Sequence, residues 1–149
     1  MRQLFLASVI AATPFLAFAD AAEDAIEARE GYMKMLAMNM GVLSGTAKGE
    51  IAFDQAAVTA AASNIENLSK YNTLPALFIP GTAPADGKET EALAAVWEKP
   101  EEFAQKYAGF QEAAAGAGEA VAGGADSLGP VLQKLGGACK ACHDDFRKE

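Results

Sequence analysis

The chain has 149 residues, with 12 basic and 20 acidic side chains and a formal net charge of −8. An acidic surface is repelled by phosphate backbones and anionic lipids, so nucleic acid and membrane surfaces are excluded as expected partners, whereas a basic protein is allowed. About 130 residues follow the N-terminal segment described next, which is enough for one domain with its own hydrophobic core.

Residues 1–19 have the pattern of a secretory signal peptide. Arg2 supplies the positive start, an apolar stretch follows, and residues 17–19 (Ala-Phe-Ala) match the small-x-small cleavage pattern. The alternative is an uncleaved membrane anchor, but the apolar stretch is shorter than the ~20 residues that span a bilayer. We therefore expect export, cleavage before Asp20, and a mature domain of residues 20–149 in a bacterial periplasm, with no membrane attachment after cleavage.

The mature sequence predicts helices throughout, because alanine is abundant and runs of alternating β-branched residues are missing. The first helix is expected at about 23–43, where apolar side chains recur at steps of three and four residues. The second is expected at about 54–71, with Asp54 as its N-cap, since a carboxylate there accepts the free amide hydrogens of the first turn. An irregular segment with prolines follows, and residues 90–97 are expected to add a short turn.

The third helix is expected to start at Pro100 and to stop at residues 123–124, with Gly116 and Gly118 marking a place where another helix packs closely. The fourth is expected to start after Asp126, a second N-cap candidate. Four amphipathic helices with short links predict an all-α fold, an antiparallel four-helix bundle.

The only cysteines and the only histidine of the chain are Cys139, Cys142 and His143, which fall within five residues. On a helix the two thiols project from the same face, and the imidazole lies one turn from Cys139. Cys-x-x-Cys-His is the signature of covalent haem attachment, in which the thiols add to the two vinyl groups of one haem and the adjacent imidazole becomes an axial iron ligand. The motif predicts one covalently bound haem c.

Three other kinds of site use the same side chains. A thioredoxin-like redox disulfide needs a βαβ setting, which the helical pattern does not offer. A structural zinc ion takes four protein ligands, and only three are available here. A structural disulfide across three helical residues would close a very small loop and stabilise the fold little.

The ligand on the other side of the iron decides the function. A strong sixth protein ligand gives an electron carrier, whereas a vacant apolar position lets a small gas bind. No second histidine is available, so methionine is the candidate, and Met33 and Met40 lie on the apolar stripe of the first helix. Either methionine can instead fill the core, for which its flexible side chain is well suited.

Two arginines are candidate haem contacts. Arg29 lies one turn before Met33 on the same apolar stripe, where a cation needs an anion, and the haem propionates would supply one. Pairing with Glu or Asp, or snorkelling to the surface, is the alternative. Arg147 follows His143 by one turn and is a candidate for the haem edge, although a base at this place also complements the helix dipole.

The whole mature chain resembles cytochrome c′, the class II c-type cytochromes of bacterial periplasms. Three segments carry the resemblance: residues 27–33, residues 74–82 with Leu-Pro-Ala-Leu-Phe and Pro-Gly-Thr, and residues 135–147 with the haem motif close to the C-terminus. The family has the four-helix bundle fold expected above.

The resemblance implies further site residues beyond the attachment motif. Arg29 and Glu30 match a pair that neighbours the haem, and Glu91 falls where the family has an acidic residue in contact with it. Met33 aligns with the distal residue beside the vacant iron position. In a related low-spin subgroup a methionine at this place is the sixth ligand.

Arg29 and the Pro-Gly-Thr segment resemble the five-coordinate branch. That resemblance implies a protein that binds nitric oxide and carbon monoxide and exchanges electrons with a redox protein partner. The alternative is a low-spin electron-transfer cytochrome with its iron held between Met33 and His143. An enzyme is not expected, because no distal histidine is available for acid–base chemistry. The resemblance also implies a homodimer through the first two helices, which carry the small residues Ala47, Ala56 and Ala60.

Overall fold

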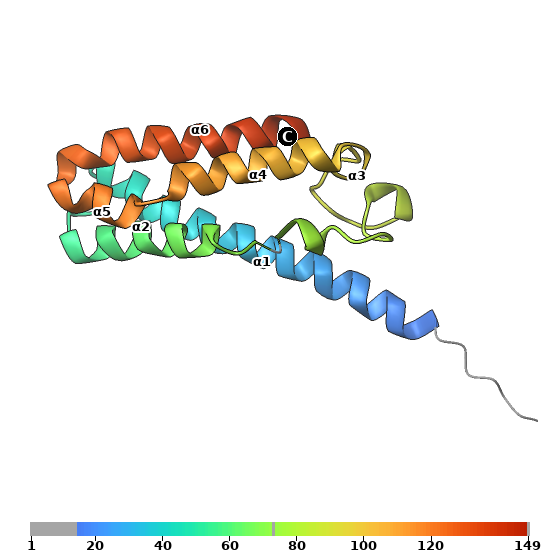
Figure 1. The fold of residues 1–149 in the computed structure, drawn as a ribbon. Helices are drawn as coiled ribbons and strands as arrows, with labels where there is room; N and C mark the ends of the chain where they lie inside the picture. Colours follow the sequence, from blue (N-terminus) through green and yellow to red (C-terminus); the bar gives the residue numbers. More distant parts are fainter. Residues whose placement is uncertain (1–14, 73, 149) are drawn as a thin grey trace, which may run out of the picture.

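The computed structural model describes residues 15–72 and 74–148. Its four long helices are α1 (Phe15–Ala47), α2 (Gln55–Ser69), α4 (Pro100–Ala114) and α6 (Leu128–Phe146). Successive long helices run in opposite directions, with α1 beside α2 and α4 beside α6 (Figure 1). The prediction of an all-α, antiparallel four-helix bundle is confirmed.

Short helical pieces connect the long helices. The 3₁₀ turns η1 (Leu74–Leu77) and η2 (Pro84–Asp86) and the single-turn helix α3 (Ala95–Glu98) lie between α2 and α4. The α4–α6 connection holds α5 (Ala117–Ala120), η3 (Val121–Gly123) and η4 (Ala125–Ser127). We call residues 74–94 the long loop; it covers the end of the bundle at which α6 ends (Figure 1).

The first two helices follow the expectation, with different ends. Asp54 is the N-cap of α2, because its carboxylate accepts hydrogen bonds from the backbone amides of Ala56 (2.8 Å) and Ala57 (3.2 Å). Helix α1 is longer than expected at both ends and starts five residues before Asp20. Residues 1–14 of the expected signal peptide lie outside the described residues.

Two expectations at the end of the third helix and the start of the fourth are wrong. Helix α4 ends at Ala114, because Ala115 is extended and Gly116 has φ +73°, a left-handed conformation that interrupts the helix. Asp126 does not cap α6, since it lies inside η4 and the residue before α6 is Ser127, whose side chain makes no capping bond. The close approach expected at Gly118 is confirmed, because the residue packs against Ser63 of α2.

The core has two parts. The larger part runs along all four long helices and includes the fully buried Leu43, Ile65 and Leu135. The smaller part, built on Val96, Phe103 and Phe146, lies where α3, α4 and α6 meet under the long loop. Within the described residues, no helix has the length and apolar character that crossing a bilayer requires.

Candidate functional site

A cavity of about 690 Å³ lies between α1, α4, α6 and the long loop. Its wall is mostly apolar, with Leu36, Phe78 and Phe110 among its side chains. All eight residues that the sequence predicted for the site line this cavity: Arg29, Glu30, Met33, Glu91, Cys139, Cys142, His143 and Arg147. Four chain segments far apart in sequence therefore meet where the haem motif lies.

Helix α6 presents the attachment motif to the cavity. Cys139, Cys142 and His143 are each half-buried, and no disulfide joins the two cysteines. Burial raises the pKa of both thiols, that of Cys142 to about 11. Burial also lowers the pKa of His143, with a smaller contribution from Arg147, so the imidazole is neutral at physiological pH, the form that binds metals.

The methionines of α1 divide between the cavity and the surface. Met33 and Met40, the two on the apolar stripe, line the cavity. Met35 and Met38 have exposed fractions of 47% and 74% and lie outside it. Of these four methionines, only Met33 and Met40 are therefore placed to approach a group bound in the cavity.

Arg29 is buried, with an exposed fraction of 3%, and it donates hydrogen bonds to the long loop. Its Nη1 donates to Thr82 Oγ1 (2.9 Å) and to Leu77 O (3.3 Å). Its Nη2 donates to Thr82 O (3.0 Å) and to Thr90 Oγ1 (2.9 Å). The pairing with Glu or Asp that the sequence left open is not seen, since none of the ion pairs within the described residues includes Arg29.

The C-terminal end of α6 closes the same end of the cavity. Leu93 donates its backbone N–H to Phe146 O (2.9 Å), and Lys148 donates its own to Glu91 O (2.8 Å). These bonds form a short antiparallel bridge that places the exposed Glu91 beside Arg147 at the cavity rim. Glu30 lies at the rim as well and forms a 3.8 Å ion pair with Lys34.

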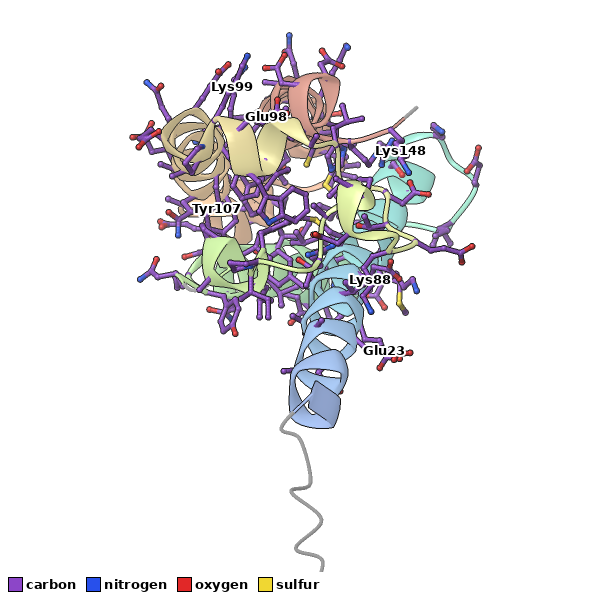
Figure 2. The ribbon with its side chains drawn as sticks, turned by 90° about the vertical axis from the view of Figure 1, so that its right-hand side faces the viewer. Glu23, Lys88, Glu98, Lys99, Tyr107 and Lys148 are labelled. Atoms are coloured by element: carbon purple, nitrogen blue, oxygen red, sulfur yellow. The ribbon has the colours of Figure 1, made fainter. Side chains whose placement is uncertain are left out.

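Sequence reasoning missed a pair of tyrosines in the cavity wall. The Tyr32 and Tyr107 hydroxyls lie 3.0 Å apart, both rings are buried, and Figure 2 shows Tyr107 among the interior side chains, with Lys99 and Lys148 at the periphery. Neither tyrosine stood out in the sequence as more than a packing residue, because one sequence does not show which residues of two helices meet.

The two hydroxyls have two protons for three contacts. Tyr32 also lies 3.0 Å from Leu68 O, and Tyr107 lies 2.8 Å from Tyr71 O. Both carbonyls also accept a backbone amide, Leu68 O from Tyr71 and Tyr71 O from Leu74 at 3.5 Å. With Tyr32 donating to Tyr107, and Tyr107 donating to Tyr71 O, the two hydroxyl oxygens do not face each other without a proton between them.

Thr82 and Thr90 were also missed as site residues. Both are buried, and both accept a guanidinium hydrogen bond from Arg29. The Pro-Gly-Thr segment drew attention to Thr82, but its partner lies 53 positions earlier in the chain. The sequence held no local signal for this contact.

The residues and the cavity fit a covalently attached haem. Two thiols three residues apart and an adjacent imidazole face the same mostly apolar cavity, which is the donor set of c-type attachment. Its volume lies in the range of about 300–1,000 Å³ that cofactor pockets occupy. Arg29, a buried cation in the wall without a carboxylate ion-pair partner among the described residues, suits a ligand that carries anionic groups.

Comparison with known proteins gives matches over the bundle and the motif together. A family model described as Cytochrome C′ matches residues 24–147. Cytochrome c′ of Cereibacter sphaeroides is 43% identical over 147 residues, covering 99% of this chain and 98% of that protein. Cytochrome c-554 of the same organism is 40% identical over 127 residues, covering 85% of this chain and 82% of that protein.

Among solved structures, cytochrome c′ from Rhodobacter Spheriodes has a TM-score of 0.79 and 42% sequence identity, and the match covers 86% of this chain and 98% of that chain. Because these matches span the helices, the long loop and the attachment motif as one unit, the chain belongs to the cytochrome c′ family and is a haem c protein with its haem covalently attached.

Proposed function

We propose that this protein binds nitric oxide or another small gas at a haem iron that has His143 as its only protein ligand. The composition of the cavity wall carries this proposal. The wall contains the single histidine of the chain, and most of its other side chains are apolar. An apolar surrounding admits a neutral diatomic molecule and makes the entry of anionic or strongly polar ligands costly.

The side chains have separate roles in this proposal. Cys139 and Cys142 form the two thioether bonds, and His143 is the proximal ligand, which its lowered pKa keeps neutral and ready to bind iron. When bound, the haem supplies an iron that holds a gas and exchanges one electron. Arg29 would offer a fixed positive charge to the haem carboxylates, and Arg147, which also lines the cavity, would be a second cation available to them.

A solved structure supports the gas ligand. The nitric oxide complex of a mutant of cytochrome c prime from Alcaligenes xylosoxidans has a TM-score of 0.70 and 30% identity to this chain, and the match covers 86% of this chain. We extend nitric oxide as a ligand to the present protein, with carbon monoxide as a second gas. The proposed role is binding, without catalytic turnover. Electron exchange with a redox protein partner belongs to the same proposal.

The proposal includes export and dimer formation. Residues 1–19 direct the chain to the periplasm and are removed before Asp20. A groove lined by Met35, Met38 and Tyr71 follows α1 and α2 and offers an apolar face to a second copy. A solved cytochrome c′ described by its unusual ligand-controlled dimer dissociation, with a TM-score of 0.76 and 27% identity, supports a homodimer.

The alternative is a low-spin electron carrier in which Met33 is the sixth iron ligand. Met33 lines the cavity, and a relative named cytochrome c-554 is nearly as similar to this chain as the first cytochrome c′ relative. Thioether ligation at this place would fill the position that a gas needs and would leave only electron transfer.

Absorption spectra of the protein exported from a host that attaches haem separate the two functions. We expect an intact mass of residues 20–149 plus one haem, and a high-spin ferric spectrum that changes when nitric oxide is added. A low-spin spectrum that ignores nitric oxide, and becomes high-spin in Met33→Leu but not in the exposed control Met38→Leu, would establish the alternative. A colourless protein with the mass of the polypeptide alone would exclude both.

A further inference from the structure

The guanidinium of Arg29 is held by two threonines of the long loop. Thr82 has an exposed fraction of 0%, and Thr90 is buried as well. Their hydroxyls accept from Nη1 and Nη2 at 2.9 Å each, and the carbonyl of Thr82 accepts from Nη2 at 3.0 Å. Thr82 therefore holds both ends of the fork, and Thr90 holds Nη2 from a second part of the loop, a geometry that a guanidinium allows and a point charge does not.

The environment of Arg29 holds a positive charge without a carboxylate partner. Its hydrogen-bond acceptors are neutral oxygens, and its Cζ lies 4.7 Å from the ring centroid of Phe78 and 5.5 Å from that of Trp97. Burial lowers the pKa of Arg29, and the neighbouring Glu30 offsets this partly. A guanidinium keeps its proton even so, and the aromatic faces and hydroxyl oxygens stabilise the cation.

Each threonine hydroxyl is also fixed from its other side. Thr82 Oγ1 donates to Ile79 O at 2.7 Å, so its lone pairs face Arg29. Thr90 Oγ1 accepts from the backbone N–H of Ala92 at 3.2 Å in addition to Arg29. The polar contacts therefore form a continuous path from α1 through Arg29, Thr90 and Ala92 to the bridge with the end of α6.

We propose that Thr82 and Thr90 are positioning residues, which hold the Arg29 guanidinium as a fixed cation in the wall of the haem cavity and fasten the long loop across α1 and α6. The proposal deepens the function proposed above and rests on it for the presence of haem. A fixed cation in a poorly hydrated wall favours the addition of an electron to the haem, whereas a guanidinium released to water is screened and has less effect. The threonines act through Arg29: Thr82 lies outside the cavity lining, and Thr90, which lines the cavity, acts by holding Nη2 of Arg29.

Valine and serine substitutions test the proposal in the haem-loaded protein. Thr82→Val and Thr90→Val keep the shape and remove the hydroxyl, whereas Thr82→Ser and Thr90→Ser keep the hydroxyl. The matched control is Thr46→Val, because Thr46 is a buried threonine whose hydroxyl donates to Val42 O of its own helix and makes no contact with the long loop. Two readouts are measured for each variant: the haem reduction potential, and amide hydrogen exchange across the long loop.

We expect both valine variants to have a lower haem reduction potential than the wild type. The serine variants, which keep the hydroxyl, should have the wild-type potential. In Thr90→Val, exchange of the Ala92 and Leu93 amides should be about tenfold faster. The loop loses the hydrogen bonds that the Thr90 hydroxyl makes with Arg29 and with the Ala92 amide. Thr46→Val should change neither readout. The proposal would be overturned if Thr82→Val and Thr90→Val matched Thr46→Val in both reduction potential and hydrogen exchange. It would also be overturned if the serine variants exchanged as fast as the valine variants.

The proposed function and this inference fail in different ways. A protein without attached haem contradicts the proposed function, but the hydrogen-exchange comparison still tests the contacts between Arg29 and the two threonines. Normal haem attachment and nitric oxide binding, with potentials unchanged in both valine variants, contradict the positioning role alone.

Discussion

At the scale of single residues, burial keeps two tyrosines of the cavity wall neutral. Tyr32 and Tyr107 are both buried, so a phenolate at either position would be poorly solvated, and burial is the first cause that raises the pKa of each. The hydrogen bond from Tyr32 to Tyr107 raises the Tyr32 pKa further, because ionisation would break it. The neutral pair therefore belongs to the folded state and links α1 with α4.

The tyrosine pair predicts how stability depends on alkaline pH. The pKa of each phenol is higher in the folded chain than the value of about 10 in the unfolded chain, so above that pH the unfolded chain releases protons that the folded chain retains. The stabilisation from the neutral pair is complete below pH ~10 and is lost as the pH rises beyond it. We expect the melting temperature to fall over this range.

The double variant Tyr32→Phe with Tyr107→Phe is the comparison for this effect. It should be less stable than the wild type at pH 8, by roughly 1–3 kcal/mol for the lost hydrogen bonds, and its melting temperature should fall less steeply above pH 10. Thermal unfolding followed by circular dichroism at several pH values gives both quantities. Equal slopes in the two proteins would show that the phenols do not resist ionisation.

The attachment motif could be singled out from the sequence, and the two threonines that hold Arg29 could not. Cys139, Cys142 and His143 have no competitors of their kind, so the cavity contains them as predicted. Thr82 and Thr90 are ordinary loop residues whose importance comes from Arg29, 53 and 61 positions away. A contact of that kind depends on the folded loop and leaves no periodic pattern.

At the scale of helices, the break between α4 and α5 brings α5 against α2. Gly116 makes the turn, and Gly118 then lies so close to α2 that an added Cβ would stand 3.3 Å from Ser63 Cβ and 3.4 Å from Ser63 Cα. The amide of Gly118 also donates to the Glu66 carboxylate at 3.4 Å. Glycine is therefore needed at position 118 for packing against α2, and at position 116 for the left-handed turn.

Two glycine-to-alanine changes with opposite expected signs test this packing. Gly118→Ala should destabilise the protein by about 1–3 kcal/mol, because the methyl group overpacks the α2–α5 contact. Gly109→Ala should stabilise it by roughly 0.5–1 kcal/mol, since Gly109 lies inside α4 with no atom within 4 Å of an added Cβ. Chemical denaturation measures both changes.

The partner residue provides the check on Gly118. Adding Ser63→Ala to Gly118→Ala should recover part of the lost stability, because it removes the hydroxyl that the methyl group meets first and places no glycine inside α2. If Gly118→Ala is as stable as Gly109→Ala, helix α5 does not pack on α2 as closely as the structure places it.

Helix positions were predictable to the extent that their causes are local. The Asp54 cap and the start of α4 at Pro100 follow from side chains within the first turn of each helix. The expected continuation of α4 through Gly116 was wrong, because glycine in a helix and glycine at a left-handed turn look alike in a sequence. The course of the long loop depends on Arg29 and on the end of α6, so no local pattern specifies it.

At the scale of the whole molecule, the haem cavity and a second apolar surface share a wall. Tyr32 lines the cavity and also the groove of about 750 Å³ between α1 and α2. The groove exposes Met35, Met38 and Tyr71, a large apolar surface on a chain with formal charge −8. Contiguous exposed apolar surface of this kind marks an interaction site, and a second copy with a two-fold axis through the groove would cover it on both chains.

A carboxylate placed in the groove should disrupt such a dimer. In Met38→Glu, a side chain with an exposed fraction of 74% gains a negative charge, and a two-fold axis repeats that charge on the facing chain. The two added carboxylates would then face each other across a surface that loses water when the chains associate. Their desolvation and repulsion there cost more free energy than the same charges cost in solvent. We expect the haem-loaded wild type to sediment as a dimer and Met38→Glu as a monomer.

The control for this experiment is Ala104→Glu, which adds the same charge to an exposed position on α4, away from the groove. It should leave the dimer intact, so a loss of association in both variants would point to net charge rather than to the groove. Because Met38 lies outside the haem cavity, the absorption spectra of the two variants should match the wild type. A dimer that survives Met38→Glu at low protein concentration would place the subunit contact on another face of the bundle.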